Sequence, residues 1–108
     1  MEGRETVGLV LKGSYNTFLN QESKLVVVNS APESSDVFLS LTRSSGDSVV
    51  SGLSFSVPGN GSIEVSLNNY ELPNNYGVVT LHSAAGNNIS AWVKRRQEDN
   101  YSIPTILR

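Results

Sequence analysis

The sequence predicts an all-β protein: an antiparallel two-sheet β-sandwich of immunoglobulin-like architecture, with seven or eight strands and little or no helix. Three consecutive segments, 37–41, 53–57 and 63–67, alternate apolar and polar residues with a period of two. Turn-forming residues separate them at 44–47 and at 58–61, and the second of these turns is expected to be a hairpin turn. No segment holds a 3.6-residue period. A closed barrel is the competing architecture for such strands.

The strands that precede this stretch can also be assigned. Thr6–Leu11 alternates and is expected to be an edge strand, which Tyr15–Leu19 continues after a kink at Gly13–Ser14. Lys24–Asn29 contains a continuous run of β-branched residues, and such runs are typical of strands that are covered on both faces. We therefore expect Lys24–Asn29 to be a central strand.

Two further strands follow the central stretch. Gly77–Ser83 alternates in the same way, with Val79 and Leu81 on one face. Ala84–Asn88 is rich in residues that tolerate positive φ, and it is expected to be a hairpin turn. Ile89–Arg96 is the last clear strand.

A loop and a tail complete the chain. Residues 68–75 are expected to form a crossing loop in which Tyr70 and Leu72 plug one end of the sandwich. A chain of 108 residues forms one domain, residues 1–108, which is large enough to bury a single core. Residues 97–108 are expected to be a C-terminal tail or an extra strand.

The composition argues against several classes of partner. Ten acidic and eight basic residues leave a net charge of −2, and no Lys or Arg occurs from Ser44 to Val93, so nucleic acid is not an expected partner. No apolar run approaches the roughly 18 residues of a membrane span. The surface is rich in Ser and Asn, which is common in secreted β modules. We expect an extracellular or cell-surface location if the chain is an excised domain, and a cytoplasmic location if it is complete.

Residues suited to catalysis or metal binding are scarce. His82 is the single histidine and Cys is absent, so neither a His–Cys nor a multi-His metal site is expected within one chain. The sequence lacks a G-x-S-x-G nucleophile elbow, so His82 is expected to be an ordinary residue on the polar face of its strand. Glu98–Asn100 is the main acidic cluster and offers too few oxygens for calcium. We expect no catalytic residue, no metal and no cofactor.

The last strand carries the strongest candidate for a binding surface. Trp92, Lys94 and Arg96 occupy alternate positions and are expected to project from one face. An exposed indole beside cations can stack on a sugar ring or bind an acidic group. Two alternatives remain open: Trp92 is a buried core aromatic, or the C-terminal tail covers it.

The C-terminal tail is the second candidate for a contact surface. Ile103, Ile106 and Leu107 make this segment too apolar to lie free in water. They are expected either to add a strand to this domain or to dock on a neighbour. Docking on a neighbour predicts a homo-oligomer or a tandem array of modules.

Several segments together resemble small bacterial β-sandwich modules of the sensory-rhodopsin-transducer-like kind. The segments that carry the resemblance are Leu25–Asn29, Asp36–Leu41, Gly46, Phe55–Pro58 with the polar strand to Leu67, and Val93 with Arg95–Arg96. The resemblance implies a non-enzymatic, oligomeric sandwich with a role in signalling or ligand binding, and it assigns no binding residue. Chagasin-like protease inhibitors are disfavoured because their loop motif N-P-T-T-G is absent.

These features predict a non-catalytic structural or protein-interaction module that assembles through its sheet edges and its C-terminal tail. The alternative is a carbohydrate-binding module that uses Trp92 with Lys94 and Arg96.

Overall fold

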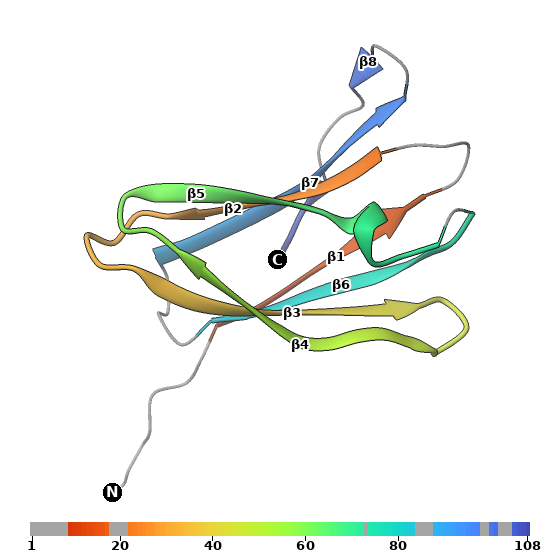
Figure 1. The fold of residues 1–108 in the computed structure, drawn as a ribbon, viewed down its shortest axis with the longest axis horizontal. Coiled ribbons are helices and arrows are strands. Elements are labelled where there is room, and N and C mark those ends of the chain that lie inside the picture. Colours follow the sequence, from red (N-terminus) through yellow and green to blue (C-terminus); the bar gives the residue numbers. More distant parts are fainter. Residues whose placement is uncertain (1–8, 18–21, 73, 84–87, 98–99, 102–104) are drawn as a thin grey trace, which may run out of the picture.

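Two antiparallel sheets face each other in the computed structural model of the chain (Figure 1), and the prediction of an all-β sandwich is confirmed. The structure describes residues 9–17, 22–72, 74–83, 88–97, 100–101 and 105–108. No described helix is long and apolar enough to cross a membrane.

The first sheet has four strands in the spatial order β1 (Leu9–Asn16), β6 (Tyr76–Ser83), β3 (Ser35–Arg43) and β4 (Ser48–Val57). The second sheet has the order β5 (Gly61–Ser66), β2 (Glu22–Asn29) and β7 (Ile89–Gln97), and β7 also pairs with the short strands β8 (Asn100–Tyr101) and β9 (Thr105–Ile106). The 3-10 turn η2 covers Leu67–Asn69, and no α-helix occurs among the described residues. As predicted, β1 is an edge strand and β2 is a central one.

The core lies between the inner faces of the two sheets. Strand β3 follows the predicted alternation, since Val37, Leu39 and Leu41 have no exposed surface while Phe38 points outward. In β2, Leu25 and Val27 enter the same core, and Val26 is 6% exposed although it lies on the outer face. The central core residues are Tyr15, Leu25, Val27, Val37, Leu39, Leu41, Val57, Val65, Leu67, Val79, Leu81, Ile89, Ala91, Val93 and Leu107.

The prediction of hairpin turns at 58–61 and 84–88 is wrong. β4 and β5 belong to different sheets, as do β6 and β7, so the chain crosses between the sheets at 58–60 and between 83 and 89. The crossing at 58–60 packs on the loop after β2, because Asn60 donates a backbone hydrogen bond of 2.8 Å to the Ala31 carbonyl. A Cβ at Gly59 would lie 2.1 Å from the carbonyl oxygen of Pro32, so this contact requires glycine. Turn residues mark where a strand ends, but they do not decide which sheet the next strand joins.

The prediction of a kink at Gly13–Ser14 is also wrong. β1 pairs with β6 without interruption from Leu9 to Asn16. Gly13 instead makes room for the tail, since a Cβ at this position would lie 2.8 Å from Cδ1 of Leu107. Residues 6–8 and 18–19 of the two predicted strand segments lie outside the described residues.

Candidate functional site

One flank of the sandwich is closed by the C-terminal residues. Leu107 donates a backbone hydrogen bond of 3.0 Å to Ala91 in the second sheet. Arg108 and Lys12 exchange two backbone hydrogen bonds of 2.8 and 2.9 Å, which connect the tail to β1 in the first sheet. The last four residues therefore bridge the two sheets along the β1 and β7 side.

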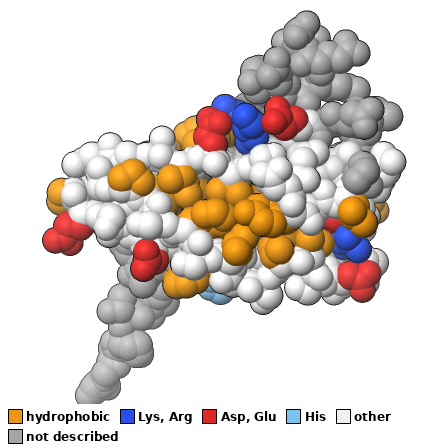
Figure 2. All heavy atoms as spheres, in the orientation of Figure 1, with side chains coloured by type: hydrophobic (Ala, Val, Ile, Leu, Met, Phe, Trp, Pro, Cys, Tyr) orange, Lys and Arg blue, Asp and Glu red, His pale blue; other side chains and the backbone are white. Residues whose placement is uncertain are grey.

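The opposite flank has no such cover in the described structure. β4 and β5 are the end strands of their sheets on this side, and each pairs with one neighbour. We call this surface the β4–β5 flank. Half-buried apolar side chains line it: Val49, Val50, Leu53, Phe55, Ile63 and Tyr70. Figure 2 shows hydrophobic side chains gathered across the middle of this face, between β5 and β4. The open flank is therefore the most apolar part of the face in view.

A groove of about 290 Å³ lies within the flank. Phe55 comes from β4, Ile63 from β5, and Tyr70 follows η2, so the groove spans the gap between the sheets. Its lining consists of Phe55, Ser56, Ile63, Glu64, Val65, Ser66, Asn69 and Tyr70. The lining offers apolar surface together with hydroxyl and amide groups and the carboxylate of Glu64. Of these residues, sequence reasoning singled out Tyr70, which was expected to plug one end of the sandwich. It gave none of them a binding role, although residues 48–57 carry no charge.

Trp92 lies on the outer face of the second sheet, as the alternation along β7 predicts. Its neighbours Ala91 and Val93 are buried in the core, while Trp92 is half-buried. Across the sheet it lies between Val26 of β2 and Ile106 of β9, and Ile106 is 60% exposed. Trp92 is thus neither a core aromatic nor fully exposed, and it forms the middle of a short apolar row.

Of the two cations expected beside Trp92, Lys94 forms an ion pair with Glu64. Lys94 Nζ donates a hydrogen bond of 2.9 Å to Glu64, and Lys24 Nζ lies 3.9 Å from the same carboxylate. The hydrogen bond from Lys94 lowers the pKa of Glu64. The backbone of Arg96 lies opposite Glu22, and its side chain is outside the described part of the chain. This face therefore presents apolar surface beside a compensated charge cluster.

The three apolar tail residues Ile103, Ile106 and Leu107 differ in their placement. Leu107 is 3% exposed and belongs to the core of its own domain, whereas Ile106 points outward. Ile103 lies outside the described residues. Of the two expected arrangements, a strand added to this domain is realised by β9.

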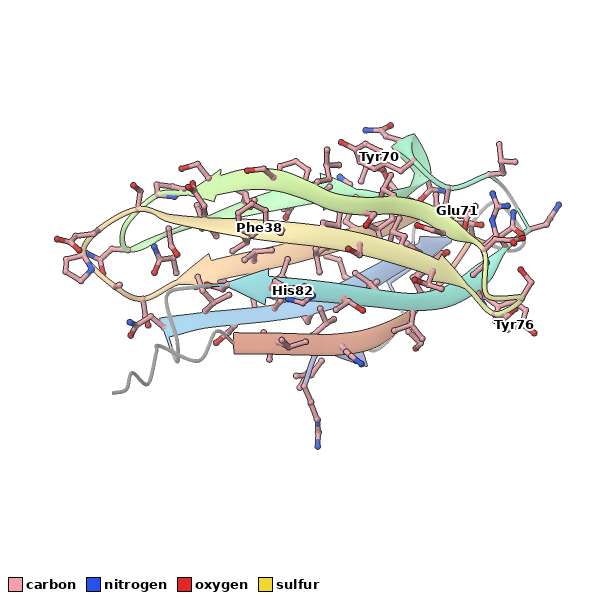
Figure 3. All side chains as sticks on the ribbon, turned by 90° about the horizontal axis from the view of Figure 1, so that it is seen from below. Phe38, Tyr70, Glu71, Tyr76 and His82 are labelled. Carbon is pink, nitrogen blue, oxygen red and sulfur yellow. The ribbon has the colours of Figure 1, made fainter. Side chains whose placement is uncertain are left out.

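Glu71 is a buried charge that sequence reasoning missed. Loop residue Leu72, expected to plug the sandwich, is 62% exposed, while the Glu71 side chain has no exposed surface. Tyr15 Oη donates a hydrogen bond of 2.5 Å to Glu71 Oε2, and Arg43 Nη2 donates one of 2.9 Å to Oε1. The backbone N–H of Leu72 donates a further bond of 2.8 Å. Figure 3 shows Glu71 beside Tyr70 at the η2 end of the sandwich.

The hydrogen bonds determine the protonation of this cluster. Burial alone would raise the pKa of Glu71, but the bonds from Arg43, Tyr15 and Leu72 and the guanidinium charge together lower it. Burial, the bond to Glu71 and its negative charge raise the pKa of Tyr15. The cluster is therefore a carboxylate held by a neutral phenol and a cation, an arrangement that ties the 70–72 loop to β1 and β3.

The remaining chemistry-bearing side chain, His82, is exposed on the outer face of β6 opposite Phe38 of β3 (Figure 3). Among the described residues, no group of three or more His, Asp or Glu side chains is placed to hold a metal ion. Glu98 and Asp99 lie outside the described residues.

No family model and no curated protein matches this sequence. Among solved structures, the chain is similar to the crystal structure of Thermotoga maritima 1070, with a TM-score of 0.64 over 91% of this chain and 92% of that chain. The two sequences are 14% identical, so the similarity concerns the fold alone.

Proposed function

We propose that the protein is a non-catalytic structural module that assembles with copies of itself, as a homo-oligomer or as a tandem array, through its β4–β5 flank. One observation carries this proposal: the C-terminal residues cover one flank of the sandwich and leave apolar side chains and two strand edges along the other. Exposed strand edges beside apolar surface favour association with another chain. Because Leu107 is part of its own core, assembly is assigned to the flank and not to the tail.

Light scattering of the full chain over a wide concentration range tests this function. We expect a species larger than the monomer whose proportion rises with concentration. Ser54→Lys should weaken it about tenfold, because a charge on β4 opposes edge contacts at a cost of about 1 kcal/mol for each symmetry-related pair. Ser14→Lys places the same charge on the outer face of β1 and should leave assembly unchanged. A monomer at every concentration would refute the proposed function.

A second candidate is carbohydrate binding at Trp92. The half-buried indole lies between Val26 and the exposed Ile106, which gives an apolar strip suited to a sugar face. A glycan array followed by titration of the best hit should then show that Trp92→Ala weakens binding at least tenfold. The control Phe38→Ala removes an exposed aromatic from the other sheet and should bind like the unmodified chain. An unchanged affinity in Trp92→Ala would remove this candidate.

A further inference from the structure

We propose that the flank between β1 and β7 is a binding site for an extended peptide of another protein, in which an acidic residue follows an aliphatic one. The chain's own C-terminal residues occupy this site as an internal ligand. The site lies on the side of the sandwich opposite the β4–β5 flank, so the proposal goes beyond the proposed function and does not depend on assembly there.

The tail is held through its backbone. Residues 105 and 106 pair with β7, and Leu107 donates a hydrogen bond of 3.0 Å to the Ala91 carbonyl. Arg108 and Lys12 exchange two bonds of 2.8 and 2.9 Å, which is the pattern of one antiparallel pair at the edge of β1. Figure 1 shows the C-terminal end between β7 and β1. Because these bonds use main-chain groups, a strand of another sequence can make them equally well.

The last three side chains alternate between the core and water. Leu107 is 3% exposed, whereas Ile106 and Arg108 are exposed. Peptide recognition by strand addition has the same anatomy, since main-chain bonds supply affinity and pockets for alternate side chains supply specificity. The site should therefore select an aliphatic residue at the position of Leu107.

The recess for that aliphatic side chain belongs to the two sheets. A Cβ on Gly13 would lie 2.8 Å from Cδ1 and 3.1 Å from Cγ of Leu107, so a side chain at position 13 competes with the leucine for the same space. The strands around the recess are held by other partners, because β1 pairs with β6 and β7 pairs with β2. The walls of the recess are therefore formed by strand pairs that do not include the tail.

Charge makes the tail an imperfect ligand for its own site. Arg108 lies directly opposite Lys12 in the pairing with β1, and both residues are exposed. Like charges directly opposite each other on neighbouring strands are destabilising, and opposite charges are stabilising. A peptide with Asp or Glu at the position of Arg108 therefore fits the site better than the tail does.

Binding of synthetic peptides to the full chain tests this site. Trp92 is the only tryptophan and pairs with Ile106, so its emission should change when a peptide replaces the tail. Leu107→Ala in the full chain weakens the hold of the tail and leaves the walls of the recess unchanged. This variant should bind a peptide with the sequence of residues 103–108 at least tenfold more tightly than the unmodified chain, in which the tail competes as an intramolecular ligand.

Variants of the peptide and of the recess test the assigned chemistry. Leu107→Ala in the peptide should weaken binding at least tenfold, because the recess then stays empty. Arg108→Glu in the peptide should strengthen binding several-fold, because an opposite charge then faces Lys12. Adding Gly13→Val to the Leu107→Ala chain should abolish binding, because the valine fills the recess.

Hydrogen exchange on the unmodified chain tests the site even where Leu107→Ala does not fold. The backbone N–H groups of Leu107 and Arg108 should exchange at least tenfold faster than that of Val27 in the central strand β2, because the tail opens while the sheets stay paired. Equal exchange rates would overturn the proposal, since the tail would then open only when the whole domain unfolds. Equal binding of the leucine and alanine peptides to folded Leu107→Ala, or no binding of either, would also overturn it. Weaker binding of the Arg108→Glu peptide would refute the assigned acidic partner.

Discussion

Glu71 illustrates how much a single residue can contribute to this fold. Its carboxylate is buried, and it receives hydrogen bonds from Tyr15, Arg43 and the Leu72 backbone. These three partners come from β1, from β3 and from the loop after η2. The interaction therefore connects segments that are up to 56 positions apart in the chain.

Replacing Glu71 should destabilise the protein strongly. In Glu71→Gln the charge is lost, but the Arg43 side chain is 28% exposed and can be solvated, so the loss of hydrogen bonds to a charged acceptor should cost about 2 kcal/mol. Urea unfolding at neutral pH and a fixed protein concentration measures this free energy. Glu33→Gln, which changes an exposed loop residue, should alter it by less than about 0.5 kcal/mol. An equally small effect in both variants would contradict the role assigned to Glu71.

The same cluster predicts a pH dependence of stability. The folded state lowers the pKa of Glu71, so its contribution is complete above the unfolded value of about 4.3 and is lost as the pH falls through the lowered pKa. The folded state raises the pKa of Tyr15, so stability falls as the pH rises above about 10. Unfolding free energies measured from acid to alkaline pH check both the loss of stability at low pH (the acid limb) and the loss at high pH (the alkaline limb). Glu71→Gln should flatten the acid limb and Tyr15→Phe the alkaline limb.

At the scale of elements, the short strand β9 and the residues that follow it act as an internal closure. Leu107 fills the space left by Gly13, and Arg108 pairs with Lys12. The neighbouring Ile106 projects outward beside Trp92. The adjacent residues Ile106 and Leu107 therefore have opposite roles, as expected where an extended chain points successive side chains to opposite sides.

This difference can be measured with two matched variants. Leu107→Ala should lower the free energy of unfolding by about 3 kcal/mol, because it leaves a cavity in the core. Ile106→Ala should lower it by less than about 0.5 kcal/mol, because most of the side chain is in water. Thermal and urea unfolding report both values. Equal losses in the two variants would contradict the placement of Leu107 inside the domain.

At the scale of the whole molecule, the charge cluster around Glu64 borders the β4–β5 flank, whereas β4 itself is uncharged. Lys24, Glu64 and Lys94 interact on the outer face of the second sheet, whereas β4 carries no charge. Assembly through the β4–β5 flank should therefore depend on burial of apolar surface and hardly on ionic attraction.

Assembly is expected to change by less than about twofold between low and moderate sodium chloride, because salt screens only charged contacts. Sulfate should strengthen it, since excluded salts favour the burial of apolar surface. Analytical ultracentrifugation across both salt series measures the association constant. A steep loss of assembly in sodium chloride would instead implicate the charged face around Glu64.

The sequence was informative wherever a choice depended on neighbours in the chain. Alternation at 37–41 separated core from surface because successive strand residues point to opposite faces, and the same rule placed Trp92 on the outside. The run of β-branched residues at 26–28 correctly indicated a central strand. These are local properties of a strand.

Contacts between distant segments could not be inferred in this way. The chain crosses between sheets at 58–60, Glu71 is buried because Arg43 and Tyr15 meet it there, and Leu107 enters the core because Gly13 leaves room. Each outcome depends on which segments become neighbours after folding, and the period of a strand carries no such information. The sequence by itself determined the strands, the faces they present and the sandwich class. Only the tertiary structure decided that the tail closes one flank and that β4 and β5 are the end strands on the other, because edges exist only once the order of strands in each sheet is fixed.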